Sequence, residues 1–102
     1  MRDYYLFILA TVCRNTGFTE HEVLHDKREM CTDARYLLIH FLSRQLKCNE
    51  IVYYSGISKQ AVSQISNQYS MRLRFKSSMR WAEKDIEKEI SDYAIYSHYS
   101  QE

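Results

Sequence analysis

Apolar residues recur every three or four positions along nearly the whole chain, which is the spacing of amphipathic helices. The first apolar set is Leu6, Leu9, Ala10 and Cys13, with Tyr5, Ile8 and Val12 beside it. Gly17 should end this helix, because only glycine enters the left-handed region at little cost. Thr19 and Glu22 then have the spacing of a capping box. This predicts a short second helix through Leu24.

Two longer helices follow from the same spacing. One should begin within Lys27-Arg28-Glu29 and run to about Leu46. Its expected core face is Ala34, Leu37, Leu38, Phe41 and Leu42. The other is expected over residues 77–96, with apolar positions at Met79, Ala82, Ile86, Ile90, Tyr93 and Ala94. Trp81 is expected to pack this last helix onto the body.

Residues 49–65 have the pattern of a helix, a tight turn and a second helix. The expected roles are a cap at Asn49, a turn at Gly56, a corner plug at Ile57, a cap at Ser58 and core positions at Val62 and Ile65. This arrangement is typical of a helix-turn-helix, whose second helix enters the major groove of DNA by its N-terminal end.

The composition supports a helical fold. The chain has 102 residues, no proline and two glycines. Sandwiches and barrels need many Gly- and Pro-rich turns, and phosphate-binding P-loops or Rossmann motifs need several glycines. Aromatic residues make up 14%, which favours a folded chain. We therefore predict an all-α bundle of five to six helices containing a helix-turn-helix, forming a single domain over residues 1–102.

Cysteine usage and hydropathy bear on location. Cys13, Cys31 and Cys48 are an odd number and contain no CxxC pair, which favours a reducing, cytoplasmic environment over a disulfide framework. The apolar run at residues 4–13 is too short to cross a bilayer, and no small-x-small cleavage site follows it. We expect neither a membrane span nor a cleaved signal there.

The net charge of +1 conceals an uneven distribution. Residues 1–46 are balanced. Residues 47–80 carry six basic side chains against Glu50 alone, a net charge of +5, whereas residues 81–102 carry a net charge of −4. A phosphate-binding surface needs local positive potential rather than a basic total. The basic block coincides with the predicted helix-turn-helix, so the sequence favours double-stranded DNA as the partner.

The outer face of the second helix should present compact or amide-bearing side chains: Ser58, Lys59, Gln60, Ser63, Gln64 and Asn67. Gln and Asn can pair bidentately with adenine, and Lys can donate to guanine. Ser58 and the free amides at the helix start could also hold a phosphate. Three further basic residues of this block are expected at phosphates: Arg72, Arg74 and Lys76. Lys47 is a further candidate DNA-binding residue.

A family resemblance adds to this interpretation. Residues 27–42, which open with a basic turn and contain the Ala34-Arg35 pair at the start of a long apolar helix, resemble the opening of the C-terminal DNA-binding domain of the bacterial replication initiator DnaA. Residues 12–24 resemble the helices that precede it, and the resemblance spans roughly residues 5–70. It implies a Trp-repressor-like fold and places Lys27, Arg28 and Arg35 near DNA.

The recognition helix departs from that family. The initiator has Arg-Asp-His-Thr-Thr-Val where this chain has residues 57–62, Ile-Ser-Lys-Gln-Ala-Val, so only Val62 agrees. Origin recognition therefore does not carry over. The prediction is a DNA-binding regulator of transcription, bacterial or from a mobile element. The alternative is a helical protein–protein interaction module that has lost DNA binding.

Other chemistry has weaker support. His21 and His25 lie one turn apart with Cys31 nearby, but a zinc site normally needs four ligands in a compact pattern, so no metal is expected. The alternating charges of residues 83–89 suggest a solvated helix face rather than a catalytic carboxylate pair. We expect no enzyme activity, cofactor or small-molecule substrate. The tyrosines Tyr93, Tyr96 and Tyr99 suit either a helix end or the contact of a homodimer.

Overall fold

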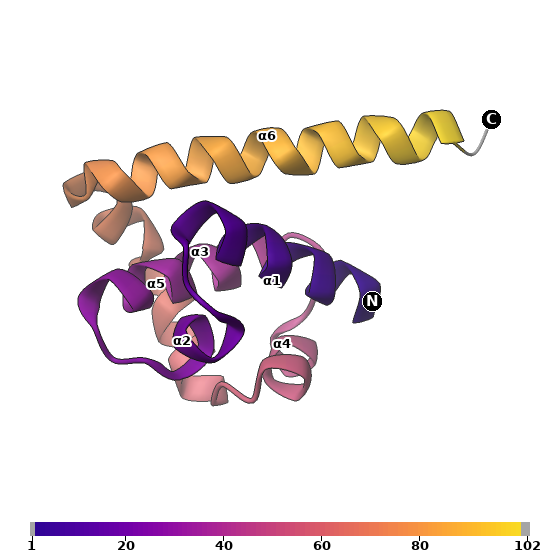
Figure 1. Cartoon of the computed structure of the whole chain (residues 1–102). Helices are drawn as coiled ribbons and strands as arrows, with labels where there is room; N and C mark the ends of the chain where they lie inside the picture. The colour runs from indigo at the N-terminus through magenta and orange to yellow at the C-terminus, as the bar shows by residue number, and fades with distance from the viewer. Residues whose placement is uncertain (1, 101–102) are drawn as a thin grey trace.

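Residues 2–100, the part of the chain that the structure describes, fold into six helices and contain no strand. In this computed structural model, side chains are described for residues 2–93. The helices are α1 (Arg2–Thr16), α2 (Glu20–His25), α3 (Glu29–Leu42), α4 (Cys48–Ser55), α5 (Lys59–Phe75) and α6 (Ser77–Ser100) (Figure 1). The predicted all-helical fold is confirmed.

Helix α3 forms the centre of the core. It packs against α1, α2, α5 and α6. Its buried residues occupy nearly its whole circumference: Cys31, Asp33, Ala34, Tyr36, Leu37, Leu38, Ile39, Phe41 and Leu42. A helix that is apolar on most sides must be covered by other helices, which explains why the remaining elements surround it.

Helix α1 buries a different face from the one expected. Its core face consists of Tyr5, Ile8, Leu9 and Val12, which follow a regular i, i+3, i+4, i+7 spacing. Leu6 and Ala10, expected in the core, are exposed. Gly17 ends the helix as predicted, with φ of +79°, and the predicted capping box of Thr19 and Glu22 is present at α2.

Helix α3 ends at Leu42, four residues before the predicted end. The backbone N–H of Arg44 bonds to the carbonyl of Phe41, and that of Gln45 bonds to Leu42, so the chain tightens into a turn. Leu46 is nevertheless buried. Its apolar side chain extended the helical pattern in the sequence, but it reaches the core from this turn.

Helix α6 lies along one side of the bundle (Figure 1). Met79 and Ile86 are buried, and Ile90 packs against the core, as predicted. Trp81 was expected to dock the helix, but it is 67% exposed. At 100° per residue it points about 160° away from Met79 and therefore toward solvent. Lys84 lies over its ring, with Nζ 5.3 Å from the ring centroid.

The glutamates of α6 form ion pairs with the bundle at its solvent-exposed edge: the side chains of Glu87 and Glu89 are paired yet 44% and 38% exposed, and Lys84, Asp85 and Lys88 are exposed, as predicted. Glu87 forms a two-pronged ion pair with Arg44, at 2.8 and 2.6 Å. Glu89 accepts from Arg14 and from the amide of Asn15. These carboxylates flank the apolar stripe of α6 and pair with Arg14 and Asn15 of α1 and with Arg44 in the turn after α3. Charge alternation alone could not reveal these pairs.

The tyrosine series at the end of α6 is only partly described. Tyr93 stacks on Phe7 of α1, with ring centroids 4.3 Å apart. The side chains of Tyr96 and Tyr99 lie outside the described residues. A homodimer contact through this series therefore stays a prediction. None of the described helices combines the length and the apolar character needed to cross a membrane.

Candidate nucleic-acid interface

The connection between α4 and α5 is a tight turn built by three consecutive residues. Gly56 has φ of +75°, in the left-handed region, and its N–H bonds to the carbonyl of Val52. Ile57 is buried in the corner between the helices. Ser58 precedes α5, and its hydroxyl accepts from the backbone N–H of Ala61. All three residues have the roles that the sequence predicted: turn, corner residue and helix cap.

The start of α4 differs from the prediction. Asn49 was expected to cap the helix, but α4 already begins at Cys48. The carboxylate of Glu50 accepts from the backbone N–H of Lys47, at 3.0 Å. This reach-back bond satisfies an N–H at the helix start and removes the need for a cap at Asn49.

Helix α5 has two sharply different sides. Val62, Ile65 and Tyr69 are buried. Gln60, Gln64 and Asn67, which we call the amide stripe, are exposed. At 100° per residue the amide stripe lies opposite the buried residues. No described residue hydrogen-bonds to these three amides, and the 17 residues of α5 include no acidic side chain.

Exposed side chains of cationic or hydroxyl type surround the amide stripe. Ser63 and Lys59 lie on the same helix and are exposed. Lys47, Lys59 and Arg74 are exposed and form no ion pair with a described residue. Helix α5 starts on the side of the bundle away from the acidic α6 and ends where α6 begins (Figure 1). Its N-terminal half therefore lies apart from the carboxylates of α6.

Two cations predicted at phosphates are engaged within the protein. Nε of Arg72 donates to Asp33 of α3 at 2.7 Å, and the guanidinium lies over the ring of Tyr36 at 4.6 Å. Lys76 pairs with both Asp33 and Glu29. The count of +5 for residues 47–80 thus includes two cations that α3 neutralises. A segment-by-segment count cannot register such pairs, because their acids lie about 40 residues earlier.

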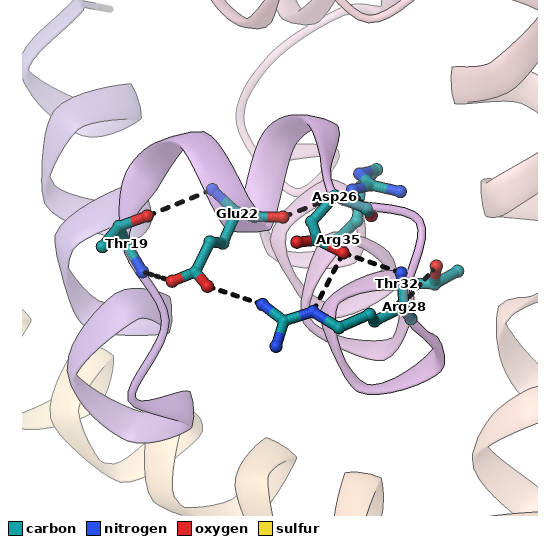
Figure 2. Close-up of polar contacts among 6 residues, drawn as sticks. All are labelled: Thr19, Glu22, Asp26, Arg28, Thr32 and Arg35. Carbon is teal, nitrogen blue, oxygen red and sulfur yellow. Dashed lines mark hydrogen bonds and ion pairs between the residues drawn. The ribbon is translucent and has the colours of Figure 1, made fainter.

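Arg28 joins α2 to the start of α3. It donates to Glu22 at 2.6 Å and to Asp26 at 3.1 Å (Figure 2). The backbone N–H of Thr19 and then Arg28 hold the pKa of Glu22 below its usual range. Arg28 has the same effect on the pKa of Asp26. The guanidinium is still exposed, so its charge is balanced locally but remains accessible.

Arg35 is half-buried and donates hydrogen bonds to carbonyls at the end of α2. Its guanidinium donates to the backbone carbonyls of Val23, Glu22 and Asp26. Carbonyls at a helix C-terminus lack partners within the helix, and a cation is favourable there. Figure 2 shows Arg35 directed at this corner. The neighbouring Lys27 is exposed.

The predicted site residues therefore fall into three groups. One group is exposed on or beside the first turns of α5: Ser58, Lys59, Gln60, Ser63, Gln64 and Asn67. Lys47 and Arg74 are exposed at the start of α4 and near the end of α5. The third group is held by bonds within the protein and consists of Arg28, Arg35, Arg72 and Lys76. Lys27 is exposed and belongs to none of the three groups.

Sequence reasoning missed the residues that hold α5 in place. The hydroxyl of Tyr36 donates to Gln68 at 2.8 Å, and that of Tyr69 donates to Glu83 at 2.5 Å. Asp33 is buried and accepts from Arg72 of α5 and from Lys76, the residue that follows α5. One signal was available for Asp33: a lone carboxylate among the apolar residues of the central helix requires a charged partner.

The candidate metal ligands do not converge. Rings of His21 and His25 stand 5.1 Å apart by their centroids. Within the described residues, no three His, Cys, Asp or Glu side chains are grouped as a metal ion requires. Cys31 is buried, whereas Cys13 and Cys48 are partly buried, and all three are free.

Comparison with known proteins gives no further guide to this surface. No protein-family model, curated protein or solved structure matches the chain.

Proposed function

We propose that the chain binds double-stranded DNA through a helix-turn-helix made of α4, the Gly56 turn and α5, with the N-terminal half of α5 in the major groove. One observation carries the proposal: the exposed face of the N-terminal half of α5, residues 59–70, is polar and free of acidic residues, and it lies opposite the core residues Val62, Ile65 and Tyr69. An interior helix needs no such separation, and a merely solvated helix usually mixes both charges.

The charge around this face supports the same function. Lys47, Lys59 and Arg74 are exposed cations that no described acid neutralises. In the proposed complex they contact phosphates, while the free N–H groups after Ser58 face a phosphate at the helix start. Lys27 is a further exposed cation at the α2–α3 corner. Arg28 could exchange one of its carboxylate partners for a phosphate.

Arg72, Lys76 and Arg35 have a different role in this proposal. Their donors already bind Asp33, Glu29 and backbone carbonyls. Moving them to phosphates would leave the buried Asp33 and the end of α2 without partners, which costs free energy. They orient the binding helix and the α2–α3 corner instead of contacting DNA.

The proposed biological role is that of a small cytoplasmic DNA-binding regulator, bacterial or from a mobile element, with a Trp-repressor-like arrangement. It is supported by the resemblance of residues 27–42 to the DnaA C-terminal domain and by the tight turn at Gly56 between α4 and α5. The initiator's recognition signature is missing, so the proposed target is a different DNA sequence.

A salt titration tests DNA binding. Fluorescence anisotropy with a random 20-bp duplex should show binding at about 50 mM salt that weakens steeply by about 200 mM, because phosphate neutralisation releases counterions. Lys59→Ala and Arg74→Ala should each lower the affinity and reduce the salt slope by about one. Lys88→Ala is the matched control, because Lys88 is exposed on the far side of α6. Binding that ignores salt would contradict the proposal.

A second candidate is the protein–protein interaction module. Phe75 and Trp81 are 78% and 67% exposed where α5 meets α6, and Met71 is 67% exposed one turn earlier. A contiguous patch of exposed apolar side chains is typical of interaction sites, and these three residues would form such a patch in this candidate function. Light scattering of the pure chain, with and without duplex, separates the two functions. A stable protein complex that excludes the duplex would favour this candidate.

A further inference from the structure

The exposed face of the N-terminal half of α5 has three amide side chains that can read adenine, and it has neither an arginine nor an acidic residue. We infer that the protein prefers A·T base pairs and reads them in the major groove through Gln60, Gln64 and Asn67. This inference rests on the proposed function and adds the class of DNA that the site selects.

The spacing of the amide stripe fits one track along a groove. Gln60, Gln64 and Asn67 are four and three residues apart, so their side chains lie above one another on one side of α5. The distance from first to last is about 10 Å at 1.5 Å per residue, or about three base-pair steps. Each amide offers one acceptor and two donors, which match N6 and N7 of adenine in a bidentate pair.

The amides are available for this task. Gln68, the fourth amide of α5, accepts from the hydroxyl of Tyr36 and is therefore occupied. The amide stripe has no hydrogen-bond partner among the described residues and is exposed. Its neighbours Ser63 and Ser66 are small, so they allow the helix to approach base edges closely.

The commonest readers of G·C pairs are missing from the part of α5 that carries the amide stripe, and the exposed Arg74 lies about two turns beyond Asn67. Arginine is the commonest reader of guanine, and Asp or Glu accept from cytosine. Residues 59–71 contain neither arginine nor an acidic residue. Arg72 is bound to Asp33 on the protein side of α5. Lys59 could donate to guanine, but it lies about 100° around the helix from Gln60 and therefore off the line of the amide stripe.

Three 20-bp duplexes with the same order of purines and pyrimidines test the inference. One contains only A·T pairs, one only G·C pairs, and one replaces guanine by inosine. Equal length keeps the phosphate contribution equal. An inosine–cytosine pair has the major-groove pattern of G·C but lacks the minor-groove amino group, so it resembles A·T there. We expect the A·T duplex to bind at least about tenfold more tightly than both others.

The outcomes distinguish this inference from the proposed function. Equal binding of all three duplexes overturns the A·T preference but leaves DNA binding intact. Binding of the inosine duplex as tightly as the A·T duplex overturns major-groove reading, and a G·C preference overturns the assignment of the amides. If none of the duplexes binds at about 50 mM salt, the proposed function fails and this inference fails with it.

A variant tests the named residues directly. Gln60→Ala, Gln64→Ala and Asn67→Ala together should reduce binding of the A·T duplex to the level of the G·C duplex, with the helical circular dichroism unchanged because all three side chains are exposed. Gln45→Ala removes an exposed amide from the turn after α3 and should keep the preference. A triple variant that keeps the A·T preference would overturn the inference.

Discussion

Asp33 of α3 and Arg72 of α5 form an ion pair at 2.7 Å that joins the centre of the core to the proposed DNA-binding helix. Asp33 is buried, and its second oxygen accepts from Lys76. One carboxylate thus holds the C-terminal half of α5, while the N-terminal half remains exposed on its outer side. The pair fixes the direction in which the amide stripe faces.

Replacing Asp33 by Asn should lower the free energy of unfolding by about 2 kcal/mol. The change leaves two cations beside a neutral side chain in a largely buried position. Urea denaturation monitored by circular dichroism measures the loss. Asp85→Asn, an exposed position of α6 with no ion pair among the described residues, should change stability by less than about 0.5 kcal/mol. Equal effects of the two variants would show that the pair does not stabilise the fold.

The docking of α6 predicts very different losses of stability for two apolar residues. Ile86 is fully buried, so Ile86→Ala should cost about 2–4 kcal/mol through lost burial and a cavity. Trp81 is 67% exposed, and Trp81→Ala should cost less than about 1 kcal/mol despite the larger side chain removed. Thermal or urea unfolding checks both. A larger loss for Trp81→Ala would mean that α6 presents its other side to the bundle.

Replacing Gly56 should lower the free energy of unfolding, because its backbone conformation disfavours other residues. Nothing lies within 4 Å of the position that a Cβ would take, but φ is +75°. Gly56→Ala should therefore lower the free energy of unfolding by about 1–2 kcal/mol, since the left-handed region disfavours alanine. Asparagine tolerates this region better, so Gly56→Asn should lose less. Equal stability of Gly56→Ala and the parent chain would contradict the turn geometry.

His40 should make stability depend on pH below neutrality. Its ring stacks on Tyr69 at 4.0 Å between centroids. Burial, and then the charge of Arg44, lower the pKa of His40, while Glu83 and Glu87 oppose this. A lowered histidine pKa means that the unfolded chain binds more protons, so stability is full above about 6.5 and falls as pH drops through the lowered value.

The variant His40→Gln tests this dependence. It should flatten the part of the stability curve just below pH 6.5, measured by urea unfolding at successive pH values. The loss of stability below about pH 4.5 should remain, because Glu22, Glu87 and Glu89 have lowered pKa values from hydrogen bonds and ion pairs. An unchanged slope near pH 6 would contradict a neutral, buried His40.

Local signals in the sequence predicted most of the fold. Helix ends and turns depend on backbone chemistry within a few residues, so the sequence alone predicts them. This holds for Gly17, Gly56, Ser58 and the capping box of Thr19. The polar outer face of α5 was likewise predicted, because a period of 3.6 residues separates it from its core face.

Features that depend on distant partners were not predictable. Glu87 and Glu89 have the pattern of solvated residues, and only the positions of Arg44 and Arg14 show that they dock α6. Arg72 has the pattern of a free cation in the sequence, but in the structure it forms an ion pair with Asp33. Leu46 prolonged the helical pattern but sits in a turn. In each case the position of the residue depends on contacts with residues that are distant in the sequence.

The most direct test of the account is a map of the DNA contact by NMR. The ¹⁵N-labelled chain is titrated with an A·T duplex at about 50 mM salt, and backbone amide shifts are followed. The account predicts the largest changes over residues 58–67, with smaller ones near Lys47 and Arg74. Changes confined to the surface around Phe75 and Trp81, or no changes at all, would contradict it.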